Sequence, residues 1–297
     1  MKNKKKYLHP ETVALLDTMA LKAKLVVEGY IIGKHQSPYH GFSVEFAEHR
    51  SYETGDEIRH IDWKLFGKTD RLYVKRYQEE TNLSSHIILD SSNSMLYKSG
   101  NISKLAYVNS LVAALSYLMI SQQDAVGLVK FSNKINKFLP PKSKPSYLNQ
   151  ILQQLDDEDT NKDTKIELVL HEMAERINKR GLIILFSDLL DEPHDVINGL
   201  KHFRHKKQEV IVFHILDRKE FEFDFDTRTQ FLDMETGEHI ITEPWLIKAN
   251  YKQIIHDLKS FYKKECQENS IDYVPIYTDE TFDKSLTEYL NKRKKLN

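Results

Sequence analysis

Two segments of the sequence have the residue types and the spacing of a site for a hard metal ion. Residues 85–94 read Ser-His-Ile-Ile-Leu-Asp-Ser-Ser-Asn-Ser, so Asp90, Ser92 and Ser94 alternate after a short apolar run. Such a run is typical of a buried strand, and alternate positions of the following loop can point their oxygens the same way. Mg²⁺ takes roughly six oxygen ligands at about 2.0 to 2.1 Å, some of them water. The spacing therefore predicts a divalent cation at these three residues.

One carboxylate and two hydroxyls leave a divalent ion under-neutralised, so we expect a second carboxylate from elsewhere in the chain or from a partner. Residues 181–187 form another nearly all-apolar run, and Asp188 follows it directly. In open α/β sheets, ligands bind at the carboxyl ends of the strands. Asp188 is therefore the predicted second carboxylate, and Asp191 is the next candidate. The alternative is that Asp and Ser residues after a strand serve only as turn and helix-capping residues.

Thr164 is predicted to supply one more oxygen. It precedes residues 166–177, where apolar residues recur at helical spacing. A helix that lies between two metal-bearing strands would present its N-terminal hydroxyl at the same edge of the sheet. The ordinary role of a threonine at this position is to cap the helix, and Thr160 is a weaker candidate ligand.

The elements that position these residues alternate between strands and helices from residue 86 onward. An apolar helix over about 103–121 is followed by a strand at 125–131, and a later strand is predicted at 209–216. A hairpin-like insert at 229–242 precedes a long helix over about 243–268. This order predicts an α/β fold with a doubly wound, mostly parallel sheet covered by helices on both faces.

Residues 1–80 are predicted to form a separate N-terminal segment, and residues 81–297 the α/β domain. The N-terminal segment is expected to begin with a helix over about 10–28 and to continue as a β-rich stretch, with short strands near 30–32 and 72–74. Its densest charge pattern places Arg50, Asp56, Arg59 and Asp62 beside Trp63. Alternating charges of this kind can form a structural network of ion pairs or a contact surface.

Composition limits the partners and the compartment. The 297 residues contain 43 Lys and Arg against 44 Asp and Glu, which gives no overall basic footprint for nucleic acid. The single cysteine, Cys266, cannot form an internal disulfide and fits a reducing compartment. Leu105–Gln123 has no charged residue and is long enough to span a bilayer, but its position after a strand predicts a core helix. We therefore expect a cytoplasmic protein without a membrane span.

The Asp-x-Ser-x-Ser pattern, a distant Thr before a helix and an Asp after a later strand together resemble the metal-ion-dependent adhesion site of von Willebrand factor A-type (vWA) domains. Thr164 follows Lys162 and Asp163, whereas related domains often carry Gly-Gly there. From about residue 20 to 295 the chain also resembles the bacterial family called domain of unknown function 58, on the segments 41–46, 50–52, 55–56, 59–63, 74–80 and 233–237.

The resemblance implies a vWA-like domain after a small β-rich segment, a bound divalent ion and an accessory role. Members of the family are commonly found with MoxR-type AAA+ ATPases, which are thought to assemble metal enzymes or envelope complexes. The leading hypothesis is a non-enzymatic protein-binding module that holds Mg²⁺, or else Mn²⁺ or Ca²⁺, and recruits an acidic side chain of a partner. The alternatives are a hydrolase that uses the ion to activate water, with Glu53, Asp56 or His60 as base, and a scaffold without metal.

Overall fold

A computed structural model of the chain describes residues 10–14, 16, 18–34, 49–52, 63–75, 83–157, 166–232 and 237–296. The chain divides into two compact units: Met1–Gly33 together with Leu83–Asn297 form the first, and Lys34–Asn82 form the second. The sequence predicted a single domain boundary between residues 80 and 81. The N-terminal helices instead belong to the α/β unit, because their apolar side chains are buried in its core.

The α/β unit is built on a sheet in the order β10-β7-β6-β3-β4-β5. Every neighbouring pair is parallel except β4 and β5, which are antiparallel. The predicted doubly wound, mostly parallel sheet is therefore confirmed. Its strands are β3 (Ser84–Asp90), β4 (Ala125–Phe131), β5 (Ile135–Lys142), β6 (Leu182–Ser187), β7 (Glu209–Leu216) and β10 (Asp272–Tyr277).

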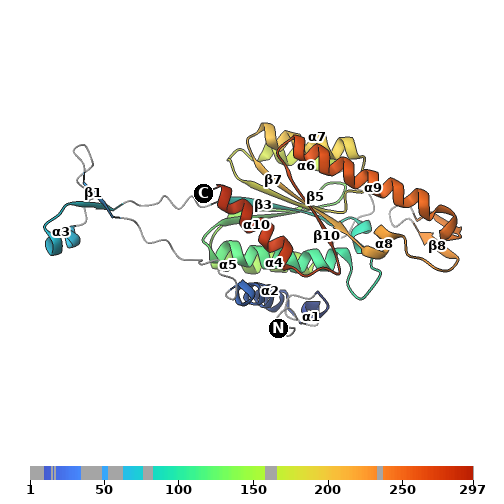
Figure 1. Cartoon of the computed structure of the whole chain (residues 1–297), viewed down its shortest axis with the longest axis horizontal. Helices are drawn as coiled ribbons and strands as arrows, with labels where there is room; N and C mark the ends of the chain where they lie inside the picture. Colours follow the sequence, from blue (N-terminus) through green and yellow to red (C-terminus); the bar gives the residue numbers. More distant parts are fainter. Residues whose placement is uncertain are drawn as a thin grey trace. The chain divides into compact units, whose positions relative to one another are not determined.

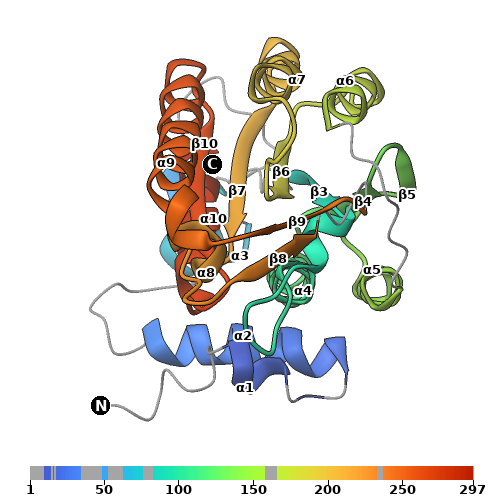
Figure 2. The same ribbon diagram turned by 90° about the vertical axis from the view of Figure 1, so that its right-hand side faces the viewer.

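Helices cover both faces of this sheet (Figure 1, Figure 2). Three of them pack on one face, and three others pack on the opposite face. The first group is α4 (Lys104–Ser121), α5 (Pro145–Asp156) and α10 (Asp283–Leu296). The second group is α6 (Ile166–Arg176), α7 (Pro193–His205) and α9 (Pro244–Glu268).

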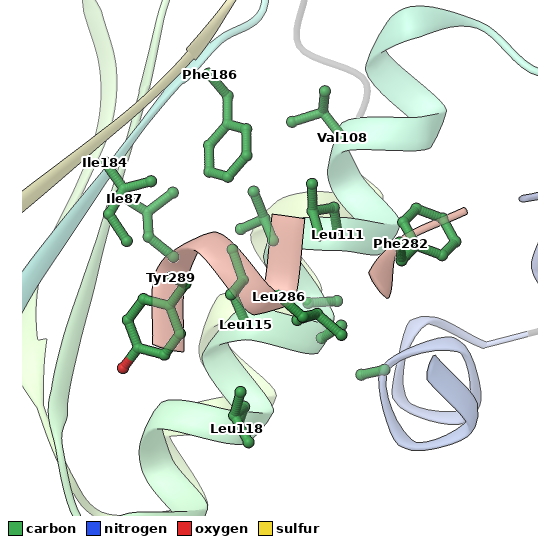
Figure 3. Packing of buried hydrophobic residues seen from close by; sticks show 14 of the residues in the cluster. Ile87, Val108, Leu111, Leu115, Leu118, Ile184, Phe186, Phe282, Leu286 and Tyr289 are labelled. Carbon is green, nitrogen blue, oxygen red and sulfur yellow. The ribbon is translucent and has the colours of Figure 1, made fainter. Parts of the chain in front are cut away.

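Successive strand residues point to opposite faces, so each central strand contributes to both cores. In β3, Ile87 belongs to the core under α4, whereas Ile88 belongs to the core under α6 and α7. Burial on both sides explains why the strands read as continuous apolar runs. Figure 3 shows the first core, where Ile87, Ile184 and Phe186 of the sheet face Leu111 and Leu115 of α4 and Leu286 and Tyr289 of α10.

The uncharged stretch predicted to be a core helix is α4. In the described part of the chain it is the one helix long and apolar enough to cross a membrane, and 78% of its most apolar window is buried within the fold. Its apolar surface is therefore covered by the sheet and by neighbouring helices, which confirms the prediction of a core helix.

The N-terminal region forms α1 (Pro10–Ala14) and α2 (Met19–Lys34). The strand predicted near 30–32 is wrong, because α2 continues through these residues. Val26 and Tyr30 are one helical turn apart and both are buried, and the Tyr30 hydroxyl lies 3.3 Å from Thr287 Oγ1 of α10. Packing against the core therefore overrides the local β propensity of this stretch.

The second unit contains an antiparallel pair of strands, β1 (His49–Ser51) and β2 (Tyr73–Lys75), and the helix α3 (Trp63–Thr69). The strand predicted at 72–74 is confirmed to within one residue. Trp63 is 57% exposed and packs edge-on against Phe66. Asp56, Arg59 and Asp62 lie outside the described residues, so the predicted charge network stays a prediction.

Both edge strands of the large sheet contain proline. β5 runs through Pro140 and Pro141, which lie where its pairing with β4 shifts register, and prolines are tolerated in edge strands and at such irregularities. The carbonyl of Pro140 accepts a hydrogen bond from the Tyr147 hydroxyl at 2.5 Å. At the other edge, the carbonyl of Pro275 in β10 accepts one from Lys284 Nζ at 2.8 Å.

The approach of β6 to β3 leaves no room for a side chain at Gly181. A Cβ there would lie 2.2 Å from the carbonyl oxygen of Ser84. We expect Gly181→Ala to lower the free energy of unfolding by about 1 to 3 kcal/mol, the usual cost of overpacking. Urea denaturation measures this, with Gly100→Ala as the control because nothing lies within 4 Å of that position. Equal stability of the two variants would contradict the close approach.

Candidate metal centre at the carboxyl edge of the sheet

Asp90 ends β3, and its side chain is fully buried. One carboxylate oxygen accepts the backbone N–H of Ser92 at 2.9 Å, and the other accepts the hydroxyl of Ser187 at 2.6 Å. The next residue, Ser91, donates both its N–H and its O–H to the carbonyl of Phe131 at 2.8 Å. These bonds tie the ends of β3, β4 and β6 together around the Asp90 carboxylate.

Ser92 and Ser94 lie in the loop after β3, at the start of a short 3₁₀ helix, η3 (Asn93–Leu96). Met95 is buried in the core and anchors this turn. The two serine Oγ atoms are 3.0 Å apart. Two oxygens in adjacent positions of an octahedron, each about 2.1 Å from the ion, would lie about 3.0 Å apart. The hydroxyl pair therefore has the spacing that a magnesium ion requires of neighbouring ligands.

Asp188 directly follows β6 and is 3% exposed. The residue after it, Leu189, is buried and adopts a left-handed backbone with φ of 52°. This conformation costs about 1 to 2 kcal/mol for a residue with a Cβ. It is held by two hydrogen bonds, from the Leu189 N–H to Ser187 Oγ at 3.0 Å and from the Tyr262 hydroxyl to the Leu189 carbonyl at 3.2 Å. Backbone strain maintained in this way is typical of functional loops.

A buried lysine that the sequence interpretation missed pairs with Asp188. Lys104, the first residue of α4, is 1% exposed and places its Nζ 2.8 Å from Asp188 Oδ2. The same Nζ lies 3.1 Å from a carboxylate oxygen of Glu220 in α8 (Arg218–Glu222). Burial opposes the charged form of the lysine, but the two carboxylates outweigh it and raise its pKa above the usual value. Lys104 therefore stays charged and links the loop after β6 to α8.

The charges of this cluster favour an added cation. Asp90, Asp188 and Glu220 carry three negative charges when ionised, against the single positive charge of Lys104. Burial first, and then the charge of Asp188, raises the pKa of Asp90 to about 7 despite the hydrogen bonds that it accepts. Burial also raises the pKa of Glu220. A divalent ion would compensate the remaining charge, so the residues fit such an ion.

His214 of β7 contacts the loop that follows β6. It is buried, and its ring nitrogens lie 3.0 Å from the Asp188 carbonyl oxygen and 2.6 Å from the Tyr273 hydroxyl. Burial lowers the pKa of this histidine to about 4, so the ring is neutral at neutral pH. A single histidine in the apolar run 209–216 was the sequence signal for this residue.

Thr164 and Thr160 lie outside the described residues, and their predicted roles stay predictions. The first N–H of α6, from Ile166, bonds to Asp191 Oδ2 at 2.8 Å, so the start of this helix is tied to the loop after β6. Asp191 thus has a capping role, which makes it a weaker ligand candidate than Asp188. Among the described residues no group of three or more His, Cys, Asp or Glu side chains could hold a metal. The candidate centre therefore depends on serine hydroxyls.

An exposed apolar surface lies beyond the same edge of the sheet. The predicted hairpin is confirmed as β8 (Thr229–Leu232) and β9 (His239–Thr242), and it is inserted between α8 and α9 (Figure 2). Five apolar residues of the hairpin and of the start of α9 are each at least 55% exposed, and we call them the hairpin patch. They are Leu232, Ile240, Ile241, Trp245 and Leu246. Ile240 and Ile241 are successive residues of β9, so both faces of the hairpin expose apolar side chains.

The parallel sheet, its antiparallel edge strand and the Asp-x-Ser-x-Ser loop at its carboxyl edge define a vWA-like domain protein. The chain belongs to the family described as "Protein of unknown function DUF58", whose family model matches residues 48–257. The predicted family and the predicted vWA-like fold are therefore confirmed, whereas the metal-ion-dependent adhesion site stays a prediction. Uncharacterized proteins of Mycobacterium bovis and Mycobacterium tuberculosis are each 21% identical over 233 residues, which cover 77% of this chain and 72% of theirs.

Comparison with solved structures finds the same fold at a TM-score of 0.50. An aerotolerance-related membrane protein from Bacteroides fragilis is 19% identical, with a TM-score of 0.50 over 71% of this chain and 99% of that chain. BatB from Bacteroides thetaiotaomicron is 19% identical, with a TM-score of 0.49 over 72% and 99%. The VWA domain of SpRpn10 is 13% identical, with a TM-score of 0.41 over 70% and 95%.

The predicted cytoplasmic location is wrong as a plain assignment. The Bacteroides fragilis neighbour is described as an aerotolerance-related membrane protein, which points away from a plainly cytoplasmic location. The prediction rested on one cysteine and on the interpretation of residues 105–123 as a core helix. Neither feature identifies the compartment in which a folded domain functions.

Proposed function

We propose that the protein is a divalent-metal-dependent protein-binding module and an accessory protein of a MoxR-type AAA+ ATPase. Ser92, Ser94 and Thr164 would hold Mg²⁺ directly, and Asp90 and Asp188 would bind it directly or through water. Mn²⁺ or Ca²⁺ could replace Mg²⁺. An acidic side chain of the ATPase or of a client protein would then complete the coordination of the ion.

One observation supports this proposal most directly. The buried carboxylates outnumber the positive charges, and they lie near two hydroxyls whose separation suits two ligands of one ion. The Ser92 and Ser94 oxygens are 3.0 Å apart, and the buried Asp90 carboxylate has a pKa raised to about 7. A cluster that has more negative than positive charge and also offers neutral oxygens is suited to a hard cation. Since protein oxygens supply only part of the coordination shell of such an ion, a ligand from a partner can occupy a further position.

The hairpin patch supports binding of a protein rather than of a small ion or molecule alone. It extends the carboxyl edge of the sheet with apolar side chains, including the 55% exposed Trp245. Aromatic anchors of this kind carry much of the binding energy in protein interfaces. An ion contact gives the partner an acidic anchor, and the patch gives it buried apolar area.

Binding of a purified MoxR-type ATPase from the same genome tests the proposal. Mg²⁺ should allow the immobilised wild-type chain to capture the ATPase, whereas EDTA or Asp90→Ala should reduce capture about tenfold or more. Asp257→Ala, which removes an exposed carboxylate of α9, should behave as wild type. Equal capture by wild type and Asp90→Ala, with or without EDTA, would exclude a metal-dependent contact.

The rival function, a hydrolase that uses the same ion to activate water, needs a general base near the ion. His214 is the described imidazole nearest to Asp188, and both of its nitrogens are engaged by Asp188 and Tyr273. Its pKa is lowered to about 4, which makes it a poor base at neutral pH. The bases predicted from the sequence, Glu53, Asp56 and His60, lie outside the described residues. Turnover of phosphate esters or peptides that is lost in Asp90→Ala would favour this rival.

A further inference from the structure

A pair of histidines on neighbouring helices lies outside the candidate metal centre. α6 and α7 run side by side on the face of the sheet opposite α4 (Figure 2), and His171 of α6 meets His202 of α7. Their Nδ1 atoms are 2.9 Å apart, and their ring centroids are 5.1 Å apart with the planes tilted by 50°. The side chains are 40% and 24% exposed, so solvent reaches both rings.

The backbone brings these two histidines together. A Cβ at Gly199 of α7 would lie 2.8 Å from the Cβ of Leu170 in α6, so the helices approach unusually closely at this point. His171 follows Leu170 directly, and His202 lies one helical turn after Gly199 on the same face. The helix pair is fixed below by buried residues such as Met173 and Phe203. The two rings are therefore presented by a rigid surface.

A glutamate carboxylate lies near the Nε2 atom of each ring. Glu175 Oε1 lies 2.9 Å from His202 Nε2, and Glu167 Oε1 lies 3.6 Å from His171 Nε2. The second oxygen of Glu175 is held by Lys206 Nζ at 2.9 Å. At 2.9 Å the Glu175 carboxylate can accept the Nε2–H of His202, which favours the tautomer in which His202 Nδ1 carries a lone pair. At 3.6 Å the Glu167 carboxylate is too far from His171 for a direct hydrogen bond. Metal-binding histidines are oriented by carboxylates in this same way.

Two lone pairs that face each other at 2.9 Å repel unless a cation lies between them. Without metal, one Nδ1 must keep its proton and donate it to the other Nδ1. When a metal replaces this shared proton, the proton moves to Nε2 of the same ring, which is His171, and solvent accepts the new N–H because this side chain is 40% exposed. No electron is transferred, and the neutral pair releases no net proton.

We propose that His171 and His202 form a binding site for a divalent transition-metal ion that prefers imidazole, of the Ni²⁺ or Cu²⁺ class. Two nitrogens at about 2.0 to 2.1 Å from one ion, at right angles to each other, lie about 2.9 Å apart, whereas tetrahedral angles require about 3.4 Å. The observed separation thus matches square-planar or octahedral geometry, which Cu²⁺ and Ni²⁺ adopt. A small rotation of each ring directs both lone pairs to one ion, and water fills the other positions.

Calorimetric titration with Ni²⁺ tests this site. The titration uses the full chain carrying Asp90→Asn, so that the candidate metal centre does not contribute. His171→Ala and His202→Ala should each weaken Ni²⁺ binding at least about tenfold, whereas His205→Ala, at an exposed position of the same α7, should not change it. Because the chain has 13 histidines, the test compares the Ni²⁺ affinity of each variant with that of its matched control. Glu175→Gln should weaken binding about tenfold, the usual effect of losing an orienting carboxylate.

Thermal unfolding gives a second readout, because an ion that joins α6 to α7 stabilises only the folded state. Ni²⁺ should raise the melting temperature of the Asp90→Asn chain and of its His205→Ala variant, but not that of His202→Ala. The melting temperatures without metal show whether each variant is folded. The proposal is overturned if His202→Ala binds Ni²⁺ as tightly as the parent chain, or if Ni²⁺ leaves the melting temperature of the parent unchanged.

Discussion

Asp90→Asn should abolish Mg²⁺ binding and should also make the metal-free protein more stable at neutral and alkaline pH. In the folded chain the pKa of Asp90 is raised from 3.8 to about 7. A carboxyl whose pKa is higher in the folded state loses stability as the pH rises from about 4 to about 7, and the full loss persists above that range. Three pKa units correspond to about 4 kcal/mol. Asparagine keeps the size of the side chain and removes this cost.

Thermal unfolding in EDTA at pH 5 and pH 8 measures the effect. The variant should gain stability over wild type at pH 8 and much less at pH 5, while Mg²⁺ should stabilise only the wild type. Asp124→Asn is the matched control, because this buried aspartate is paired with Arg293 at 2.6 Å and should lose stability at both pH values. A wild type that is stabilised by Mg²⁺ no more than Asp90→Asn would contradict the proposed centre.

Lys104→Met should produce the largest loss of stability in the α/β unit. Methionine fills a similar volume but leaves the carboxylates of Asp188 and Glu220 without their common partner at 2.8 and 3.1 Å. Removing one member of a buried ion pair costs about 3 to 5 kcal/mol. The same change removes a positive charge that repels a metal ion, so Mg²⁺ should bind more tightly and should restore part of the lost stability.

Lys130→Met provides the control for this prediction. Lys130 is also buried, but its ammonium bonds to the backbone carbonyls of Gln154 and Asp157 at 2.9 and 2.5 Å. This variant should lose stability without recovering it in Mg²⁺. Calorimetry and urea denaturation with and without Mg²⁺ would distinguish the two lysines. Equal Mg²⁺ affinity in wild type and Lys104→Met would show that the ammonium does not act on the ion.

The sequence predicted the α/β architecture and the placement of Asp90 and Asp188 because strand-end loops leave a local signal. An apolar run that ends in a carboxylate identifies both the strand and the loop after it. The partner of Asp188 could not be predicted in the same way, since Lys104 lies 84 positions away and meets it only through packing. Glu220 comes from yet another element, α8. Long-range ion pairs leave no mark in the spacing of neighbouring residues.

Backbone geometry was the other source of error. The short apolar stretch 30–32 has β-branched residues, but it continues a helix whose Val26 and Tyr30 are buried. Leu189 adopts a positive φ that its residue type disfavours. In each case the surrounding packing outweighs a local preference of about 1 kcal/mol. Local rules therefore fail at the places where tertiary contacts fix the chain.

The prolines in the two edge strands restrict how a partner can bind. An incoming polypeptide often extends an exposed sheet by adding a strand, which needs unpaired backbone donors and acceptors along the edge. Pro140 and Pro275 supply no donor, and their carbonyls already accept hydrogen bonds from Tyr147 and Lys284. The prolines thus disfavour β-augmentation by another polypeptide, and edge-to-edge aggregation of the protein itself, at both edges of the sheet. Recognition is thereby directed to the loops at the ends of the strands.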